Sequence, residues 1–429
     1  YRHTSVEDVP TGNGIDLGTT VELCRTLTDA GVNAFDITAG MQCCFELMTP
    51  PTCMPKAWNA ATSAAVKEAL GDRVRVMLTG RISDADTAER VVRDGLADFA
   101  IMGRALIADS HLVEKYAAGR KDEICPCVAC GQGCVGNADK MIPITCALNP
   151  LSGREASMPA VPKAKTPGRV VVVGAGPAGL MAAATAAERG HEVILLERSD
   201  RHGGQISLAA VPPHKEDLRL ISDYLYGKAQ RAGVTFRFSC EATPESVRNL
   251  SPDAVIVATG SLPVVPRFCA SAAGAVTAQD ILSGAEAGKN VLMLGGGLIG
   301  CETAEYLAAQ GRSVTVVEML PQLAKDMEWC ARVLLLRRMA SLGIKLRSGN
   351  EILSIGAGNA VTVRNEKGRE ETLSGFDTLV VAVGCRPDNA LSDGLSAALD
   401  CPCVAVGDCR KTAKIMDAVH SGFEAALTL

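Results

Sequence analysis

Two glycine-rich turns, each set between an apolar strand and a predicted helix, constrain the fold of this 429-residue chain most strongly. The first is residues 174–179 (GAGPAG), after the apolar run 170–173, and the second is residues 295–300 (GGGLIG), after the run 291–294. In such a turn the first glycine allows a tight bend, the second lets a pyrophosphate approach the helix, and the third allows close helix packing. The alternative is a glycine turn without a ligand, and the full context of strand, turn and helix disfavours it.

A second strand follows each glycine turn and ends in a glutamate. The run 193–196 ends at Glu197, and the run 314–317 ends at Glu318. A carboxylate in this position accepts hydrogen bonds from a ribose hydroxyl of a bound dinucleotide. Residues 319–321 (MLP) contain no arginine for a 2′-phosphate, which favours NAD(H) over NADP(H) at the second site. The chain is therefore predicted to contain two dinucleotide-binding folds.

Four cysteines upstream of these folds have the spacing of a metal site. Cys127, Cys130 and Cys134 form the pattern C-x2-C-x3-C, and Cys146 follows after eleven further residues. Thiolates without nearby histidines select an iron-sulfur cluster or zinc, and zinc ribbons usually use two C-x2-C pairs instead. We predict a cluster held by these four cysteines, with structural zinc and unligated core cysteines as the alternatives.

The N-terminal residues repeat a strand-then-helix pattern that predicts a parallel sheet, either open or barrel-shaped. Strands are expected at residues 34–38, 74–79 and 98–102, and the last two are followed by Gly80-Arg81 and Gly103-Arg104. In (β/α)8 barrels a phosphate site lies after strands seven and eight, and a glycine with an arginine suits such a site. Gly-Arg is also a common dipeptide, so each of these strand ends is a weak indication by itself.

Composition and charge argue against several classes of protein. The net charge is −5 without a basic block, which argues against nucleic acid or an anionic membrane as the main partner. The 17 cysteines do not indicate a disulfide scaffold, because disulfide-dense domains are small and secreted. The sequence contains no signal peptide and no apolar run of transmembrane length. We therefore expect a cytoplasmic protein with a small-molecule substrate, and assembly into a homo-oligomer is left open.

The second part of the chain, roughly residues 168–429, resembles flavoproteins of the pyridine nucleotide-disulfide reductase type. Besides the two glycine turns it shares a strand followed by Gly407-Asp408, where the aspartate of the family contacts the ribitol chain of FAD. The resemblance implies FAD at the first glycine turn and NAD(H) at the second. It also implies a discontinuous FAD-binding domain, residues 168–283 with 385–429, and an NAD(H)-binding domain at residues 284–384.

The complete chain resembles the branch of the old yellow enzyme family that contains 2,4-dienoyl-CoA reductase, enoate reductase and bile-acid steroid reductase. These proteins join an FMN-binding (β/α)8 barrel to a four-iron, four-sulfur cluster and then to FAD and NAD(P) domains. The implied fold class is α/β, with the C-terminal half of a TIM (β/α)8 barrel, a 4Fe-4S segment and two Rossmann-like domains. Residues 1–117 would supply barrel strands five to eight, and residues 118–167 the iron-sulfur segment and a linker.

The resemblance assigns cofactor contacts residue by residue. Cys127, Cys130, Cys134 and Cys146 fall on the cluster motif, which includes the following Asn149-Pro150. Arg2 falls on the barrel arginine that faces the flavin ring. The expected cofactor-binding residues are Arg2, Gly80, Arg81, Gly103 and Arg104 for FMN; Gly174, Gly176, Gly179, Glu197, Gly204, Gln205, Gly407 and Asp408 for FAD; and Gly295, Gly297, Gly300 and Glu318 for NADH.

The function implied by the resemblance is electron transfer from NADH to an unsaturated substrate. NADH reduces FAD, electrons pass through the 4Fe-4S cluster to FMN, and FMN reduces an activated C=C bond of a 2-enoate, an enoyl-CoA or an enone steroid. Two alternatives stay open. One is an amine or steroid dehydrogenase that runs the same chain in reverse, and the other is an electron-transfer module that lacks substrate chemistry. No catalytic residue is assigned.

The N-terminal part departs from the family pattern. A complete barrel needs about 250 residues, so we expect an N-terminally truncated barrel before the cysteine run. Where many relatives have a histidine after the sixth strand, this chain has residues 41–44 (MQCC). We expect Cys43 and Cys44 to be buried apolar filler, although a cysteine can donate a proton. Cys401-Pro-Cys403 is a candidate redox dithiol, and its tight spacing disfavours that role.

Overall fold

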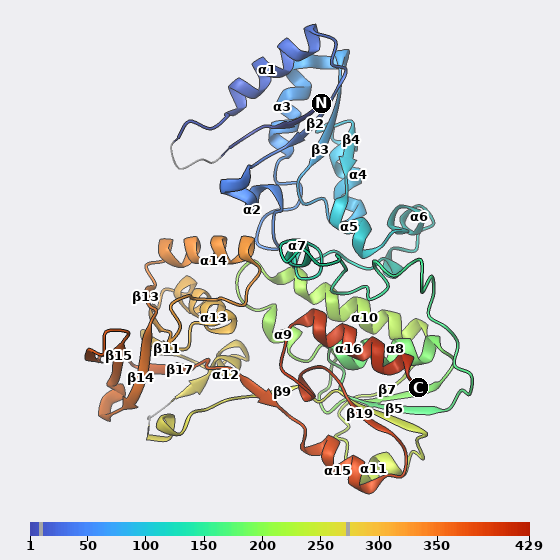
Figure 1. The fold of residues 1–429 in the computed structure, drawn as a ribbon, viewed down its shortest axis with the longest axis vertical. Coiled ribbons are helices and arrows are strands. Elements are labelled where there is room, and N and C mark those ends of the chain that lie inside the picture. Colours follow the sequence, from blue (N-terminus) through green and yellow to red (C-terminus); the bar gives the residue numbers. More distant parts are fainter. Residues whose placement is uncertain (8–11, 272–274) are drawn as a thin grey trace. The chain divides into compact units, whose positions relative to one another are not determined.

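The computed structural model describes residues 1–7, 12–271 and 275–429 (Figure 1). The chain forms two compact units. The first contains Tyr1–Glu155 and the short segment Glu328–Ala331, and the second contains Ala156–Met327 and Arg332–Leu429. Among the described residues, no helix combines the length and the apolar character needed to span a membrane. The boundaries of the four expected domains stay predictions.

The first unit is built on a four-stranded parallel sheet. Its strands lie in the order β1 (Arg2–Thr4), β2 (Ala34–Thr38), β3 (Arg75–Thr79) and β4 (Phe99–Ile101). The connections between successive strands contain α1 (Leu17–Asp29), α3 (Ala60–Leu70) and α4 (Ala85–Arg93). The predicted parallel sheet is confirmed. That this sheet is half of a barrel stays a prediction.

Apolar strand residues and capping side chains explain why these elements form. Phe35 of β2 and Val76 of β3 are completely buried in the core of this sheet, as expected where helices cover a parallel sheet. Asp84 begins α4 by accepting a hydrogen bond from the backbone N–H of Thr87 at 2.8 Å. This cap places the start of α4 close behind Gly80, at the carboxyl end of β3.

The rest of the first unit has little regular structure. Helices α5 (Gly103–Ala108) and α6 (Leu112–Ala117) precede the cysteine run, and the single turn α7 (Val135–Ala138) lies within it. The buried carboxylate of Asp109 accepts hydrogen bonds from Cys125 N at 2.9 Å and from Lys115 Nζ at 2.6 Å. Asp109 therefore anchors the start of the cysteine run to the end of the α/β region.

The second unit contains two five-stranded parallel sheets. The first has the order β19-β8-β5-β6-β7, made of Cys403–Ala405, Ala254–Val257, Arg169–Val173, Glu192–Leu196 and Thr235–Arg237. Helix α8 (Pro177–Glu188) packs against α16 (Ile415–Leu427), and Figure 1 shows the two side by side. The contact is so close that a Cβ on Gly422 would lie 2.2 Å from the carbonyl oxygen of Ala178.

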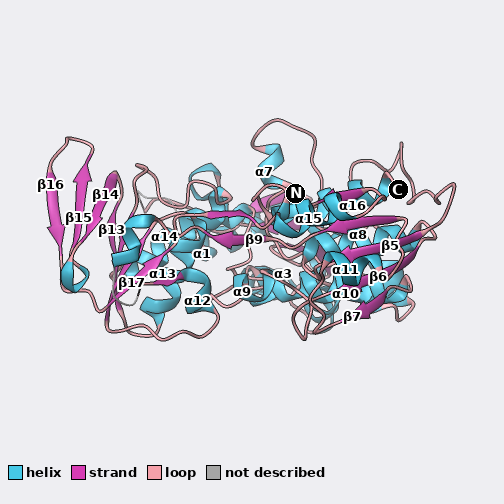
Figure 2. Cartoon of the chain, turned by 90° about the horizontal axis from the view of Figure 1, so that it is seen from below, coloured by secondary structure: helices cyan, strands magenta, loops and turns pink. Residues whose placement is uncertain are grey.

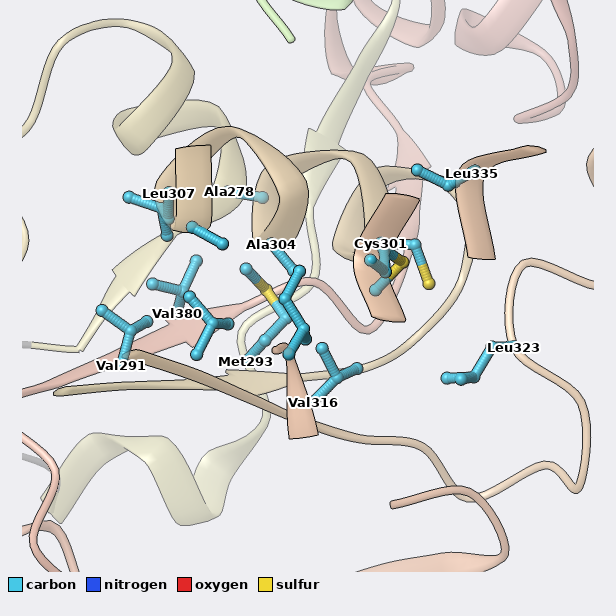
Figure 3. Close-up of a cluster of buried hydrophobic side chains, with 14 of the residues drawn as sticks. Ala278, Val291, Met293, Cys301, Ala304, Leu307, Val316, Leu323, Leu335 and Val380 are labelled. Carbon is cyan, nitrogen blue, oxygen red and sulfur yellow. The ribbon is translucent and has the colours of Figure 1, made fainter. Parts of the chain in front are cut away.

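The second parallel sheet has the same construction. Its order is β10-β17-β11-β12-β13, made of Val276–Thr277, Thr378–Val381, Asn290–Leu294, Ser313–Val317 and Lys345–Arg347. Helix α13 (Leu298–Ala309) covers it. Figure 3 shows Cys301, Ala304 and Leu307 of this helix facing Met293 and Val316 of the strands. Both predicted dinucleotide folds therefore form as parallel sheets with a helix after the glycine turn.

Two smaller sheets complete the second unit. Strands β9 (Ser261–Pro263) and β18 (Cys385–Pro387) pair antiparallel, and each directly follows a strand of one of the two large sheets. The other small sheet is antiparallel and contains β14 (Asn350–Ile355), β15 (Val361–Asn365) and β16 (Glu370–Leu373), which Figure 2 shows side by side. This three-stranded sheet was not predicted from the sequence.

Candidate cofactor sites

The first glycine turn has three glycines with three different environments. Gly174 has a φ of +103°, and a Cβ there would lie 2.4 Å from the carbonyl oxygen of Ala258. A Cβ on Gly179 would lie 1.9 Å from the carbonyl oxygen of Gly174. Around Gly176, in contrast, a Cβ would meet no atom within 4 Å. Gly174 and Gly179 are thus required by the fold itself, and Gly176 borders open space at the N-terminus of α8, where an anion binds favourably.

Glu197 is fixed between this turn and the end of β6. One carboxylate oxygen accepts a hydrogen bond from Ala175 N at 2.7 Å, and the other accepts from Ser199 N at 2.9 Å and Ser199 Oγ at 2.7 Å. A carboxylate has about four acceptor positions. One position is left for a ribose hydroxyl, and the side chain is already oriented beside the glycine turn.

The second glycine turn repeats this geometry. Gly295 has a φ of +104°, and a Cβ on Gly300 would lie 2.1 Å from the Gly295 carbonyl oxygen. Glu318 accepts from Gly296 N and from Leu320 N, both at 2.7 Å. A Cβ on Gly297 would meet no atom within 4 Å. The two turns therefore offer the same open position beside the same type of oriented carboxylate.

A chain of hydrogen bonds joins two of the predicted FAD residues. The Gln205 amide nitrogen donates to Ser261 Oγ at 2.8 Å, and Ser261 Oγ donates to Asp408 Oδ2 at 3.1 Å. The backbone N–H of Ala413 holds the other Asp408 oxygen at 3.0 Å. Ser261 was not predicted from the sequence. The available signal was its position directly after Gly260, a strand-terminal glycine of the kind found at nucleotide sites.

Gly204 and Gly407 both contact elements of the first glycine turn. Gly204 has a φ of +52°, and a Cβ there would lie 3.1 Å from the Cα of Gly176. Gly407 has a φ of +60°, and its Cβ would lie 2.8 Å from the Cβ of Ala178. Residues far apart in the sequence thus converge around the open position at Gly176.

Lys215 and Glu302 were not predicted from the sequence either. Lys215 lies between β6 and β7 of the first dinucleotide fold, Glu302 lies in α13 of the second, and their side chains form an ion pair. The Glu302 residue is 5% exposed. Burial raises the pKa of the Glu302 carboxyl, and the Lys215 charge opposes that shift. The pair is a polar connection between the two dinucleotide folds.

The four predicted cluster cysteines lie near one another. Burial raises the pKa of the Cys130 thiol to about 12 and that of Cys146 to about 11, and charges on the neighbouring thiols add to both shifts. A backbone hydrogen bond from Thr145 N to the Gly133 carbonyl oxygen, at 2.8 Å, brings the fourth cysteine back beside the first three. The spacing predicted from the sequence therefore corresponds to a neighbourhood of thiols in space.

Backbone amides point at the sulfurs of this neighbourhood. The N–H of Leu148 donates to Cys146 Sγ at 3.4 Å, and backbone N–H groups of Ala129 and Gln132 interact with Cys127 and Cys130. Such N–H···S contacts are one means by which proteins tune iron-sulfur clusters. The donor set thus fits a cluster. Within the described ranges, however, no three His, Cys, Asp or Glu side chains are already arranged as ligands of one metal ion, so a closed four-thiolate set stays a prediction.

The two Gly-Arg strand ends lie on the same side of the first unit. Arg81, which has a φ of +50°, donates to the Met54 carbonyl oxygen, and Arg104 Nη2 donates to that of Pro50 at 2.7 Å. Burial raises the pKa of Cys127, and the charges of both arginines oppose this shift. The loop 50–54 therefore gathers both guanidinium groups near the cysteine run.

Two buried side-chain nitrogen atoms without hydrogen-bond partners lie near Gly80, and they fit a bound ligand at the carboxyl end of β3. In the part of the chain that the structure describes, Trp58 Nε1 and Asn59 Nδ2 are buried without a hydrogen-bond partner. A Cβ on Gly80 would lie 3.2 Å from that Trp58 nitrogen. Buried donors are usually paired, so a bound acceptor such as a flavin oxygen or a phosphate would satisfy them. Gly103, by comparison, begins α5 at a position where a Cβ would meet no atom within 4 Å.

Arg2 is oriented by a neighbouring strand. Its Nε forms an ion pair with Asp36 Oδ2 at 2.6 Å while 66% of its side chain stays exposed. Asp36 Oδ1 accepts from Thr79 Oγ1 at 2.8 Å. The structure therefore places Arg2 on the surface of the sheet, supported by a buried carboxylate, and at a different position from Arg81 and Arg104, which bind loop 50–54.

Comparisons with known proteins agree with this geometry. Residues 168–413 match the family described as pyridine nucleotide-disulphide oxidoreductase. An NADH oxidase of Thermoanaerobacter brockii is 35% identical across 99% of this chain, and a cinnamate reductase of Clostridium sporogenes is 30% identical across 96%. The solved structure of a 2-naphthoyl-CoA reductase complex covers 100% of the chain with a TM-score of 0.92 and 29% identity.

The chain spans less than the full length of these relatives. It covers 66% of the NADH oxidase, 62% of the cinnamate reductase and 64% of the 2-naphthoyl-CoA reductase chain. The likeness nevertheless extends over both units. The chain therefore belongs to the pyridine nucleotide-disulphide oxidoreductase family, and its relatives fit the 2,4-dienoyl-CoA reductase branch of the old yellow enzyme family.

Proposed function

We propose that this chain is the cofactor-binding part of an NADH-dependent flavin and iron-sulfur oxidoreductase that reduces an activated C=C bond. The observation that carries the proposal is the repeated geometry of a glycine turn and a glutamate. Ala175 N lies 2.7 Å from Glu197, and Gly296 N lies 2.7 Å from Glu318. Two adjoining dinucleotide sites suit a hydride donor and the flavin that accepts the hydride.

The proposed substrate class comes from the names of the relatives. Cinnamate and 2-naphthoyl-CoA, named for two of them, both carry carbon-carbon unsaturation conjugated to an acyl group. When bound, NADH, FAD, a 4Fe-4S cluster and FMN would supply hydride transfer, single-electron transfer and reduction of such a bond.

Each proposed cofactor has residues that would hold it. Glu318 would bind the NADH ribose, and Glu197 with Asp408 would bind FAD. Cys127, Cys130, Cys134 and Cys146 would hold the cluster. Arg81 and Arg104 would supply positive charge for the FMN phosphate, and the unpaired nitrogen of Trp58 is a further donor at that end of the sheet.

The domain organisation that follows is part of the proposal. Residues 1–117 would be a partial FMN-binding barrel and 118–167 the cluster segment. Residues 168–283 with 385–429 would bind FAD, and residues 284–384 would bind NADH. The antiparallel pair of β9 and β18 supports two separate nucleotide folds, because the chain crosses between the two large sheets through these strands.

Anaerobic reconstitution tests the proposal. The purified chain is supplied with iron, sulfide, FAD and FMN, and NADH consumption is followed with cinnamate, a dienoyl-CoA or an enone steroid. We expect bound FAD and iron, and NADH oxidation that depends on one of these acceptors. Oxidation of an amine with an electron acceptor, without C=C reduction, would indicate the reverse reaction. Bound FAD and iron with transfer only to ferricyanide would indicate an electron-transfer module instead.

A further inference from the structure

Trp58 and Asn59 lie directly before α3 and bring polar groups to the carboxyl end of β3. The Asn59 residue is 2% exposed, so its side chain is enclosed by protein. Within the described ranges, Trp58 Nε1 and Asn59 Nδ2 are both buried and have no hydrogen-bond partner. Buried side-chain donors in folded proteins are nearly always paired. These two nitrogen atoms therefore indicate an acceptor that the protein itself does not supply.

Gly80 brings the two side chains together. It has a φ of +155°, and a Cβ there would lie 3.2 Å from Trp58 Nε1 and 3.3 Å from the Cβ of Asn59. A side chain at this position would crowd both residues. The backbone beside it is also held, because Ala57 N donates to the Arg81 carbonyl oxygen at 3.2 Å. Trp58 and Asn59 thus converge on the same point at the end of β3.

The same point lies at the N-terminus of a helix. Asn59 precedes the first residue of α3, an 11-residue helix, but its side chain makes no capping hydrogen bond. Instead, Ser5 Oγ, which follows β1, donates to Asn59 Oδ1 at 3.5 Å, and this contact orients the amide nitrogen. The first N–H groups of an α-helix have no partner within the helix and give this end a partial positive charge. The start of α3 thus suits an anion, as do the two side-chain donors beside it.

Charged side chains nearby also favour an anion. Arg81 is 8% exposed and donates to the Met54 carbonyl oxygen, which is a neutral acceptor. The carboxylate of Asp84 is balanced by Lys56, with 3.0 Å between Oδ2 and Nζ. Two neutral donors, a helix N-terminus and a buried cation match a group with several charged oxygen atoms. A phosphate monoester, with three strong acceptor oxygens, is such a group.

The loop after the neighbouring strand β2 is less suited to an anion. It carries Cys43, which is exposed, and Cys44, which is completely buried. The expectation that both are buried filler is therefore correct for Cys44 and wrong for Cys43. A thiol is a weak donor compared with an indole or amide N–H. The polar groups at the end of β3 are the stronger donors at this edge of the sheet.

We propose that Trp58 Nε1, Asn59 Nδ2 and the N-terminus of α3 together bind a phosphate monoester. Naming FMN as one source of this phosphate rests on the proposed function, whereas free phosphate is a source that does not depend on it. Arg81 and Arg104 donate to carbonyl oxygens of loop 50–54, so in this arrangement they hold the loop and supply charge. Trp58 and Asn59 supply the direct hydrogen bonds.

Fluorescence titration of Trp58 tests the site. The chain has two tryptophans, Trp58 and Trp329, and Trp329 stacks on Phe45 with 5.7 Å between the ring centroids. Trp329→Phe keeps an aromatic ring at this position and leaves Trp58 as the reporter. The purified chain is titrated with sodium phosphate, and separately with sodium acetate, at constant ionic strength. We expect a saturable change with phosphate and binding of acetate that is weaker by about tenfold or more, since a carboxylate has fewer charged oxygen atoms.

Competition with flavins identifies the source of the phosphate. Binding of FMN and of riboflavin to the unchanged chain is measured by equilibrium dialysis. If FMN is the source, phosphate displaces FMN, and riboflavin, which lacks the phosphate, binds more weakly by about tenfold or more. Phosphate binding without displacement of FMN would support the site and exclude FMN as its source. A chain that binds phosphate and FMN in this way but does not oxidise NADH would count against the proposed function alone.

Substitutions of the two donors separate direct contact from folding. Asn59→Asp places a negative charge in the site and should weaken phosphate binding by about tenfold or more. Because aspartate is a favourable residue at a helix N-cap, this variant should keep its fold. Trp58→Phe removes the N–H donor and keeps an aromatic ring, and phosphate binding measured by calorimetry should weaken by about fivefold or more.

Asn33→Asp is the matched control for the added charge. Asn33 is exposed and lies directly before β2, at the opposite end of the sheet, so this variant should bind phosphate like the unchanged chain. Circular dichroism and thermal unfolding verify the fold of each variant. Equal phosphate affinities in Asn59→Asp and Asn33→Asp would overturn the proposal. So would the absence of saturable phosphate binding to the folded chain, or acetate binding as tight as that of phosphate.

Discussion

Lys215 and Glu302 form an ion pair that joins the two dinucleotide-binding folds of the second unit, with side chains 20% and 7% exposed. Glu302 lies in the helix that follows the second glycine turn, and Lys215 lies after the first nucleotide-binding strands. A carboxylate buried to this degree depends on its partner, because an unpaired charge in such a site is strongly unfavourable.

Lys215→Met should therefore destabilise the protein more than Glu302→Gln. The first change leaves a buried carboxylate unpaired, at a cost of about 3–5 kcal/mol, while the second leaves a lysine that is partly in contact with water. Urea unfolding followed by circular dichroism measures both. The double variant Lys215→Met/Glu302→Gln should recover much of the loss. Equal effects of the two single changes would contradict a dependence of Glu302 on Lys215.

The pH dependence of Lys215→Met gives an independent test of the same pair. Burial raises the pKa of Glu302, and removing Lys215 removes the charge that opposes this shift. The folded protein then binds the proton more tightly than the unfolded chain, so stability falls as the pH rises above the ordinary carboxyl range. The loss of unfolding free energy in Lys215→Met, relative to the unchanged protein, should shrink in acid and grow toward neutral pH. A deficit that is constant with pH would exclude this explanation.

Substitutions of the two oriented glutamates should separate the two nucleotide sites. Glu318→Gln should raise the KM for NADH by about tenfold, because a hydrogen bond to a charged group contributes about 1.5–3 kcal/mol, and should leave FAD content unchanged. Glu197→Gln should lower the FAD content and leave the KM for NADH unchanged. The KM for NADH is measured by steady-state kinetics with ferricyanide as the electron acceptor. The FAD content is measured after gel filtration. The interpretation fails if either variant loses both properties while keeping its fold.

Ser261→Ala should weaken FAD binding without affecting NADH. The change removes the hydroxyl that links Gln205 to the Asp408 carboxylate, and loss of such a hydrogen bond costs at least about 1 kcal/mol, or roughly fivefold in affinity. FAD dissociation on dilution is the measurement. Ser341→Ala is a suitable control, because the Ser341 hydroxyl is exposed and bonds only within its own helix, to the Arg338 carbonyl oxygen. Equal FAD loss in both variants would remove the proposed role of Ser261.

Two glycines of the first turn should respond differently to alanine. Gly176 has a φ of −76° and open space around a Cβ, so Gly176→Ala should fold normally and lose FAD affinity. Gly179→Ala places a Cβ 1.9 Å from a backbone oxygen, and should lose up to about 3 kcal/mol of stability by overpacking. Thermal unfolding and FAD titration distinguish the two. Unchanged FAD affinity in Gly176→Ala would mean that the pyrophosphate does not pass over this residue.

Alanine substitutions in the cysteine run should separate ligands from neighbours. Cys130→Ala should lose iron and the visible absorbance of a cluster, because a four-thiolate site needs every ligand. Cys125→Ala is the matched control, since Cys125 is buried and its backbone N–H is held by Asp109. Iron and sulfide analysis after reconstitution is the measurement. Equal iron content in the two variants would refute the assignment, and a zinc content that replaces iron in the unchanged protein would support the structural zinc alternative.

Local patterns allowed much of the fold to be predicted. The strand expected at residues 34–38 agrees with β2 at both ends, and the strand, glycine turn and helix order appears twice in the second unit. The antiparallel sheet β14–β16 was missed because its strands are short and only partly apolar. Ile355, Val361 and Leu373 become a core only by packing on Leu292 and Leu294 of the neighbouring sheet.

The sequence by itself determined the two nucleotide-binding turns, because the positive φ at Gly174 and the contact of Gly179 with the Gly174 carbonyl oxygen are limits within a few residues. It also placed four thiols at ligand spacing. Only the tertiary structure decided which polar groups meet. Ser261 and Asp408 are 147 residues apart, and Lys215 and Glu302 are 87 apart. It also decided that Cys43 is exposed while Cys44 is buried. Such pairings and exposures depend on how distant segments pack, and no local periodicity carries that information.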